Sequence, residues 1–210
     1  IYRDYISDVS ENVKKISDDI LKSPILWLDG NAEIGPRALG HRSIIADARN
    51  KDHKDLLNIY KQREWWRPVA PIVLAEDIGD WFEDSYLSPY MLHNFTVKAE
   101  KAEIIPAVLH FDLTARVQSL KREDNESLYN VIREIKEKTN VPIVCNTSMN
   151  DKGEPIINTL AEAINFALRK KIGIIYAYGH RIVLKNHDLY TEMKWLKRND
   201  WPFVNHRRDR

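Results

Sequence analysis

The sequence has little cysteine, no long apolar run and almost no net charge, and each absence excludes a class of protein. Cys145 is the one cysteine among 210 residues, so no internal disulfide framework can form and a reducing, cytoplasmic setting is expected. No apolar run reaches the length of a membrane span, so we expect no membrane partner. The 32 basic and 31 acidic residues leave a net charge of +1, which argues against a nucleic-acid partner.

Several catalytic and binding motifs are also missing. The sequence has no P-loop, no GxGxxG run and no Ser/His/Asp triad. Cys145 lies in the predicted buried strand "VPIVCN", without an evident histidine base, so we expect an inert core thiol. The first methionine is Met91, and we therefore expect the chain to be a piece of a longer polypeptide.

The apolar pattern that is present indicates a mixed α/β domain. Helical spacing predicts helices over 8–22 and 125–139, and cap residues predict two more, over 51–64 after Asn50 and from a Thr159–Glu162 capping box to about residue 171. A short helix is expected over 76–83. Apolar or alternating runs predict strands over 25–30, 43–48, 69–75, 93–99, 107–112, 116–120 and 141–148, and two strands within 172–185.

Helices and strands are interleaved without strict alternation. We therefore expect an α/β (α+β) fold in which helices pack on a twisted mixed sheet. Residues 1–188 are predicted to form this domain, and the aromatic and basic residues 189–210 are predicted to be an appendage.

Four polar segments are predicted at strand or helix ends, where α/β proteins usually place ligands. The first, "GPRALGHRSI" (35–44), contains no acidic residue and offers Arg37 and Arg42 as planar forks for phosphate or carboxylate. The alternative is that each arginine pairs with a structural carboxylate such as Asp47 or Glu33.

The second segment, "KQREWWRP" (61–68), combines cations with two tryptophans. Lys61 and Arg63 could bind an anion, although cations at the end of a helix are also favoured by the helix dipole alone. Trp65 and Trp66 suit a core or a lid, and a nucleobase could stack on one of them.

The third segment, "HFDLTARVQ" (110–118), repeats polar residues two apart. On a strand, His110 and Asp112 would share one face, as would Arg116 and Gln118. A His-x-Asp pair needs a third metal ligand, and none has suitable spacing, so we expect no metal here.

The fourth segment, "NTSMNDKGEP" (146–155), alternates small polar residues along a strand end. Asn146, Ser148 and Asn150 could hold sugar hydroxyls or phosphate oxygens, or could satisfy the turn's own backbone. Together the four segments supply cations and small polar groups that suit a polyphosphate. This pattern favours phosphoryl or adenylyl transfer by positioning and charge neutralisation.

Five stretches stand in one order and at characteristic spacing: "EIGPRALGHRSIIADAR", "KQREWWRPVAP", "SPYM", "IPAVLHFDLTARVQ" and "VPIVCNTSMNDKGEPI". They resemble the C-terminal domain of carbamoyltransferases, the enzymes that carbamoylate antibiotics and nodulation factors. The similarity covers roughly residues 24–186. Leu113 stands where glycine is expected and Met149 where phenylalanine is expected, which concerns local packing more than chemistry.

The resemblance implies a fold similar to threonylcarbamoyl-AMP synthase. It implies that this domain binds ATP, with Mg²⁺, and carbamoyl phosphate, and forms carbamoyl-adenylate. It further implies an upstream transferase domain of the same chain, which would hold iron or another metal and pass the carbamoyl group to an unknown acceptor hydroxyl. A homodimer stays open.

The same motifs imply which residues form the site. Lys61, Arg116 and Ser148 are the expected catalytic residues. Phosphate or nucleotide contacts are expected from Arg37, Arg42, Ser43, Arg63, Asn146 and His110. Two alternatives stay open: a threonylcarbamoyl-adenylate synthase for tRNA modification, which would need a threonine pocket and a basic RNA-facing surface, and a non-catalytic nucleotide-binding module.

Overall fold

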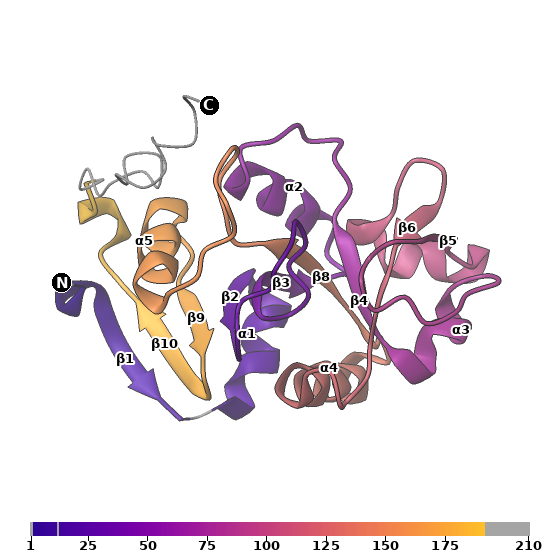
Figure 1. Cartoon of the computed structure of the whole chain (residues 1–210), viewed down its shortest axis with the longest axis horizontal. Helices are drawn as coiled ribbons and strands as arrows, with labels where there is room; N and C mark the ends of the chain where they lie inside the picture. The colour runs from indigo at the N-terminus through magenta and orange to yellow at the C-terminus, as the bar shows by residue number, and fades with distance from the viewer. Residues whose placement is uncertain (1, 12, 192–210) are drawn as a thin grey trace.

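The computed structural model describes residues 2–11 and 13–191, so most of the predicted appendage at 189–210 lies outside the described residues. Its centre is an eight-stranded sheet of order β1-β10-β9-β2-β3-β8-β4-β7 (Figure 1). The pairs β2–β9 and β4–β7 are parallel and the other neighbours antiparallel, which confirms the expected mixed sheet. The strands are β1 (Ile6–Ser10), β2 (Ile25–Leu28), β3 (Arg42–Asp47), β4 (Ala70–Leu74), β7 (Gln118–Leu120), β8 (Ile143–Ser148), β9 (Ile174–Ala177) and β10 (His180–Leu184); β5 (Asn94–Thr96) and β6 (Thr114–Arg116) form a separate ribbon.

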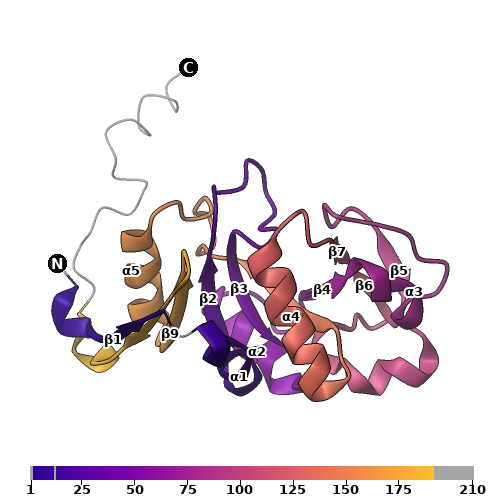
Figure 2. The ribbon, with the colours of Figure 1, turned by 90° about the horizontal axis from the view of Figure 1, so that it is seen from below.

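Helices cover both faces of the sheet. In β2, Ile25 and Trp27 belong to the core under α1 (Ile16–Lys22) and α4 (Glu126–Thr139), as Figure 2 shows for α4. Leu26 and Leu28 belong to the opposite core, which α2 (Lys51–Tyr60), α3 (Ile78–Trp81) and α5 (Leu160–Lys170) complete. Successive side chains of a strand point to opposite faces, so a strand covered on both sides is apolar throughout. Within the described residues, no helix is long and apolar enough to cross a membrane.

The predicted helix caps are present. The Asn50 side chain accepts a hydrogen bond from the Asp52 amide at 3.0 Å, at the start of α2. Thr159 and Glu162 form the reciprocal capping box of α5. The helix predicted over 51–64 ends earlier, at Tyr60, and Lys61 stands at its C-cap. Because α2 ends here, Lys61 lies beside the end of β8 and the loop that follows it.

Two predicted elements are wrong. The helix expected over 8–22 is a helix only from Ile16, because residues 6–10 pair with β10 as an edge strand. The strand expected over 107–112 is a 3₁₀ helix (Pro106–Val108) followed by a turn. Pro106 fits the first turn of a helix, and Leu113 adopts a φ of 62°, a left-handed backbone that suits glycine. His110 and Asp112 therefore do not share a strand face.

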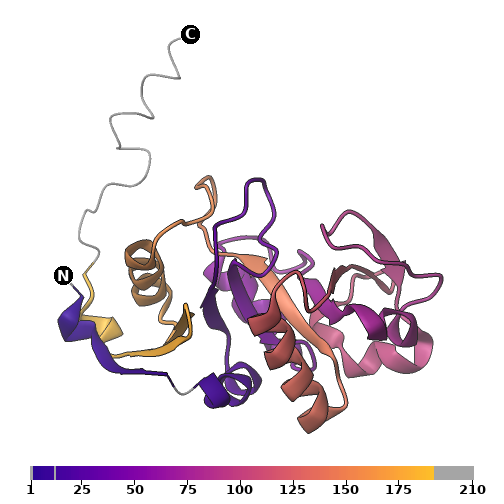
Figure 3. The ribbon, with the colours of Figure 1, turned by 60° about the horizontal axis from the view of Figure 1, so that its bottom comes forward.

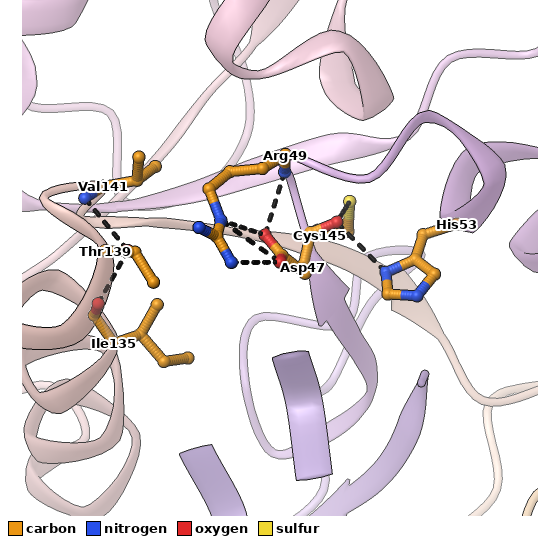
Figure 4. A network of polar contacts seen from close by, with 7 residues as sticks. All are labelled: Asp47, Arg49, His53, Ile135, Thr139, Val141 and Cys145. Atoms are coloured by element: carbon orange, nitrogen blue, oxygen red, sulfur yellow. Dashed lines mark hydrogen bonds and ion pairs between the residues drawn. The ribbon is translucent and has the colours of Figure 1, made fainter. Parts of the chain in front are cut away.

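A buried polar network occupies the far end of β3 (Figure 4). The Asp47 carboxylate accepts hydrogen bonds from the Arg49 guanidinium at 2.8–3.2 Å, while the Asp47 carbonyl accepts from His53 Nδ1 at 3.2 Å. Cys145 Sγ also faces that carbonyl, and burial raises the pKa of this thiol. Asp47 is thus paired with Arg49 rather than with the arginines of the first loop, and Cys145 is the expected core thiol.

Candidate functional site

The loop between β2 and β3 and the segment after β8 rise on the same side of the sheet (Figure 3). The Met149 amide donates to the Arg42 carbonyl at 3.1 Å, which ties the two segments together. Glu33 organises the first loop, since its Oε1 accepts from the amides of Leu39 at 2.6 Å and His41 at 2.8 Å. Neither Glu33 nor Asp47 is an ion-pair partner of the loop arginines in the described residues.

Arg42 is a structural hub of this loop. Its side chain is buried, and all three guanidinium nitrogens donate to protein oxygens. The acceptors, at 2.8–3.2 Å, are the carbonyls of Asp29, Gly30, His41 and Asn158 and the hydroxyl of Tyr178. The structure therefore does not direct Arg42 at an open phosphate site. The expected pairing with a carboxylate is also not found, because carbonyls take that place.

Ser43 and Asn146 are likewise turned inward. Ser43 is fully buried and its Oγ accepts from the Gly40 amide at 3.1 Å. Asn146 Nδ2 donates to the Ala38 carbonyl at 2.9 Å and to Gln118 Oε1 at 3.0 Å. Both amide hydrogens of Asn146 are thereby used, and the residue fixes the backbone next to Arg37.

Lys61 and Ser148 meet, as the motifs predicted. Lys61 Nζ lies 2.7 Å from the Ser148 carbonyl and 3.1 Å from Ser148 Oγ, and it also donates to both oxygens of Asn150. Burial, followed by the nearby charge of Arg63, lowers the pKa of Lys61 to about 7. The alternation of Asn146, Ser148 and Asn150 marks Asn150 as a candidate in the sequence, although it is not among the expected site residues.

A chain of cations extends from Lys61. Burial and the neighbouring Arg67 and Arg116 lower the pKa of Arg63 to about 10. Burial, and then Arg37, lower the pKa of Arg116. Neighbouring cations of this chain are therefore close enough for their positive charges to repel: Lys61 with Arg63, Arg63 with Arg116, and Arg116 with Arg37. The three segments that carry them, around Arg37, Lys61–Arg63 and Arg116, are remote in the chain, so the fold gathers like charges that an anion would stabilise.

A cavity of about 210 Å³ opens beside Arg116, lined by Pro68, Ala70, Asn94, His110 and Arg116. Arg116 Nε and His110 Nε2 are both buried without a hydrogen-bond partner in the described residues. His110 Nδ1 lies 3.0 Å from Thr114 Oγ1, and burial lowers the pKa of His110, so its neutral form is favoured. Buried polar atoms normally have partners, so these two indicate a place for a ligand.

No group of three or more His, Cys, Asp or Glu side chains in the described part of the chain could hold a metal ion. The arrangement instead offers three guanidinium groups, an ammonium and a partly buried imidazole. Such groups bind and orient phosphates and stabilise charge on their oxygens. Of the predicted residues, Lys61, Ser148, Arg63, Arg116, Arg37 and His110 come together around this region, whereas Arg42, Ser43 and Asn146 support its loops.

Comparisons with known proteins show which proteins this chain is similar to. The chain is 40% identical over 161 residues to nodulation protein NolO of Bradyrhizobium diazoefficiens, a match that covers 70% of this chain and 29% of the relative. It is 37% identical over 171 residues to nodulation protein U of Azorhizobium caulinodans, covering 81% of this chain and 30% of the relative. The chain thus spans less than a third of these relatives' length.

A solved structure shares the fold. Full-length HypF, in a phosphate- and nucleotide-bound form, matches with a TM-score of 0.52 and 17% identity, over 72% of this chain and 22% of HypF. The family profile described as Carbamoyltransferase C-terminus matches residues 18–185. That match, the motif order and the gathered cations lead to one assignment: the chain belongs to the carbamoyltransferase C-terminus family.

Proposed function

We propose that this domain forms carbamoyl-adenylate from ATP and carbamoyl phosphate. The observation that carries the proposal is the run of mutually repelling cations Lys61, Arg63, Arg116 and Arg37, next to two unpartnered buried nitrogens. Membership of the carbamoyltransferase family supports the carbamoyl donor. Transfer of the group to an acceptor hydroxyl is proposed for the rest of a longer chain.

The proposed reaction has two balanced steps. Water first cleaves carbamoyl phosphate to carbamate and inorganic phosphate. A carbamate oxygen then attacks the α-phosphorus of ATP, and the bond from that phosphorus to the bridging oxygen breaks, so that pyrophosphate leaves with the electron pair. Mg²⁺ enters with ATP as part of the substrate. Positioning and charge neutralisation account for the catalysis.

The residues divide this work by position. Arg37 and Arg116 stabilise the negative charge of the phosphates, and Arg63 extends the same surface toward Lys61. Lys61 holds Ser148 and Asn150 in place at the edge of this surface. His110, with its free Nε2 in the cavity wall, orients the bound ligand by hydrogen bonding.

The test is carbamoyl-phosphate-dependent exchange of labelled pyrophosphate into ATP, measured for wild type and for Arg37→Ala and Arg116→Ala. A charge-assisted contact is worth about 1.5–3 kcal/mol, so each substitution should slow exchange at least ~10-fold. Circular dichroism should show that both variants remain folded. Exchange that is unchanged in both variants would refute this site assignment.

A further inference from the structure

A buried cluster of charges lies behind Lys61, where the segment after β8 meets α5. Asp151 is only 8% exposed, although it is an ionisable residue in a loop. Its carboxylate lies 2.5 Å from Lys170 Nζ and also accepts from the Arg169 guanidinium, and both cations belong to the last turn of α5. The Lys170 side chain is equally buried, at 8% exposed. Water screens such a pair little, so its charges act on neighbouring groups more strongly than surface charges do.

The Asp151 carboxyl is ionised near neutral pH. Burial acts to raise the pKa of Asp151, but the contacts with Lys170 and Arg169 outweigh burial and lower this pKa below the ordinary value. Arg169 is itself held, because its Nε donates to Asn165 Oδ1 at 2.9 Å, one turn back in α5. A negative charge is therefore fixed at the end of α5.

A short chain of hydrogen bonds links this cluster to Lys61. The Asp151 carbonyl accepts from Asn150 Nδ2 at 3.2 Å and from the Glu154 amide at 3.2 Å. Asn150 Nδ2 also donates to the Glu154 carbonyl at 2.7 Å, so both amide hydrogens of Asn150 are used within this turn. The remaining Asn150 Oδ1 accepts from Lys61 Nζ and, at 2.6 Å, from Ser148 Oγ. The turn that Asp151 anchors to α5 thus orients Asn150 toward Lys61.

The two partners of the buried pair act on Lys61 with opposite signs. Burial lowers the pKa of Lys61 most. Arg63, from the segment after α2, and Lys170, from α5, lower this pKa further. Asp151 and Glu154, both from the segment after β8, raise the pKa of Lys61. A change to either partner of the pair should therefore move the Lys61 ammonium in its own direction.

We propose that Asp151 is a positioning residue for the Lys61 side of the site. Its carboxylate, anchored to α5, favours the charged ammonium of Lys61, and its turn holds Asn150 against that ammonium. Asp151 acts through Lys61 and needs no contact with the substrates. The inference rests on the proposed function, because it gives α5 a share in the affinity of the site for phosphates.

The experiment follows the Lys61 side chain itself. The 210-residue chain, isotopically labelled at its lysine Cε carbons, is titrated with base by NMR without any ligand, and Lys61→Met assigns the signal. In Asp151→Asn the titration midpoint should fall by at least about half a pH unit, because a stabilising carboxylate is lost. In Lys170→Gln the midpoint should rise by a similar amount, because a repelling cation is lost. Lys152→Gln, at the exposed neighbour of Asp151, is the matched control and should leave the midpoint unchanged.

A double variant separates the effect of charge from the effect of fold. Removing one partner of a buried ion pair can destabilise a protein, so urea denaturation accompanies each titration. Asp151→Asn combined with Lys170→Gln leaves the pair without charge, and its midpoint should lie between those of the two single variants. Midpoints that move in the same direction in both single variants, or that do not move, would make the cluster a purely structural ion pair and overturn the proposal.

ATP titration by calorimetry links the inference to the proposed function. At about pH 7, Asp151→Asn should bind ATP about two-fold more weakly, because less of Lys61 is charged. Removal of a carboxylate that acted on ATP alone would instead strengthen binding. Opposite midpoint shifts in a wild-type background that binds no ATP would support the role of Asp151 and refute the proposed function. Tighter ATP binding in Asp151→Asn would overturn the role of Asp151.

Discussion

At the scale of single residues, the candidate site gathers cations, Lys61, Arg63 and Arg116, that form no ion pair with a carboxylate in the described part of the chain. Lys61 is surrounded by four oxygens of Ser148 and Asn150, none of which carries a formal charge. Among residues 2–11 and 13–191, the acidic side chains that act on Lys61 are Asp151 and Glu154, and they do so at longer range. Burial therefore outweighs stabilisation of the ammonium, and the proton on Lys61 is held weakly.

This weak proton predicts a pH dependence of ATP affinity. Since the pKa of Lys61 is about 7, raising the pH through neutrality removes its positive charge, and an anionic ligand should bind less tightly. Loss of one proton limits the slope to about ten-fold per pH unit above the pKa. Calorimetry between about pH 6 and pH 8 measures this effect.

Lys61→Met is the matched control, because ATP itself titrates identically with both proteins. The Lys61→Met variant should bind ATP weakly, and its affinity for ATP should change with pH much less than that of the wild-type protein. A full wild-type slope in Lys61→Met would assign the titration to another group.

Arg42 tests whether a conspicuous loop arginine binds ligand or protein. Arg42→Lys replaces the planar guanidinium by a single ammonium group. Several of the carbonyls that accept hydrogen bonds from the guanidinium would then lose their partner. The free energy of unfolding should fall by at least about 2 kcal/mol in urea denaturation. Arg67→Lys, at an exposed ion pair with Glu64, should change stability by under about 0.5 kcal/mol. Unchanged stability together with weakened ATP binding would restore the phosphate-binding role first expected for Arg42.

At the scale of elements, the loop between β2 and β3 is what gives Arg37 its place. Glu33 holds the loop backbone from within, and Asn125, at the N-cap of α4, donates to the Gly40 carbonyl at 2.9 Å. Gly40 has a φ of 102°, and a Cβ there would stand 2.8 Å from Leu128 Cδ2. The loop is thus packed onto α4, and this contact restrains the loop that carries Arg37.

Gly40→Ala should therefore combine backbone strain with a clash. We expect the free energy of unfolding to fall by roughly 2–4 kcal/mol, from strain and overpacking together. Gly35→Ala is the matched control, since its φ of 144° is also positive but a Cβ would meet nothing within 4 Å. It should lose roughly 1 kcal/mol through strain alone. Equal losses in the two variants, measured by urea denaturation, would contradict packing of the loop on α4.

Sequence patterns predicted the elements whose signals are local. The capping box at Thr159 and the Asn50 cap are present, and so is the helix over 126–139. The β1 strand was missed because residues 6–10 take their conformation from pairing with β10, far away in the chain. The same limit applies to the site. The order of the motifs could predict that Lys61 and Ser148 belong to one site. No local pattern predicts that the Arg42 guanidinium donates its hydrogen bonds to backbone carbonyls.

At the scale of the whole molecule, the mixed sheet brings four distant segments to one side. β3 pairs with β8, with Ser43 opposite Ser148, and α2 ends where Lys61 reaches that strand end. β6 carries Arg116 to the same region. The match to HypF, at 17% identity, shows that this arrangement of the sheet persists when most side chains differ.

The most direct test of the central claim is whether this chain makes a carbamoyl-adenylate. Wild-type protein would be incubated with MgATP and labelled pyrophosphate, with carbamoyl phosphate, with threonine and bicarbonate, or with neither. We predict exchange into ATP only with carbamoyl phosphate, and a product of the mass of carbamoyl-adenylate. Exchange that requires threonine and bicarbonate would identify a threonylcarbamoyl-adenylate synthase instead. ATP binding without exchange under any condition would contradict the catalytic account.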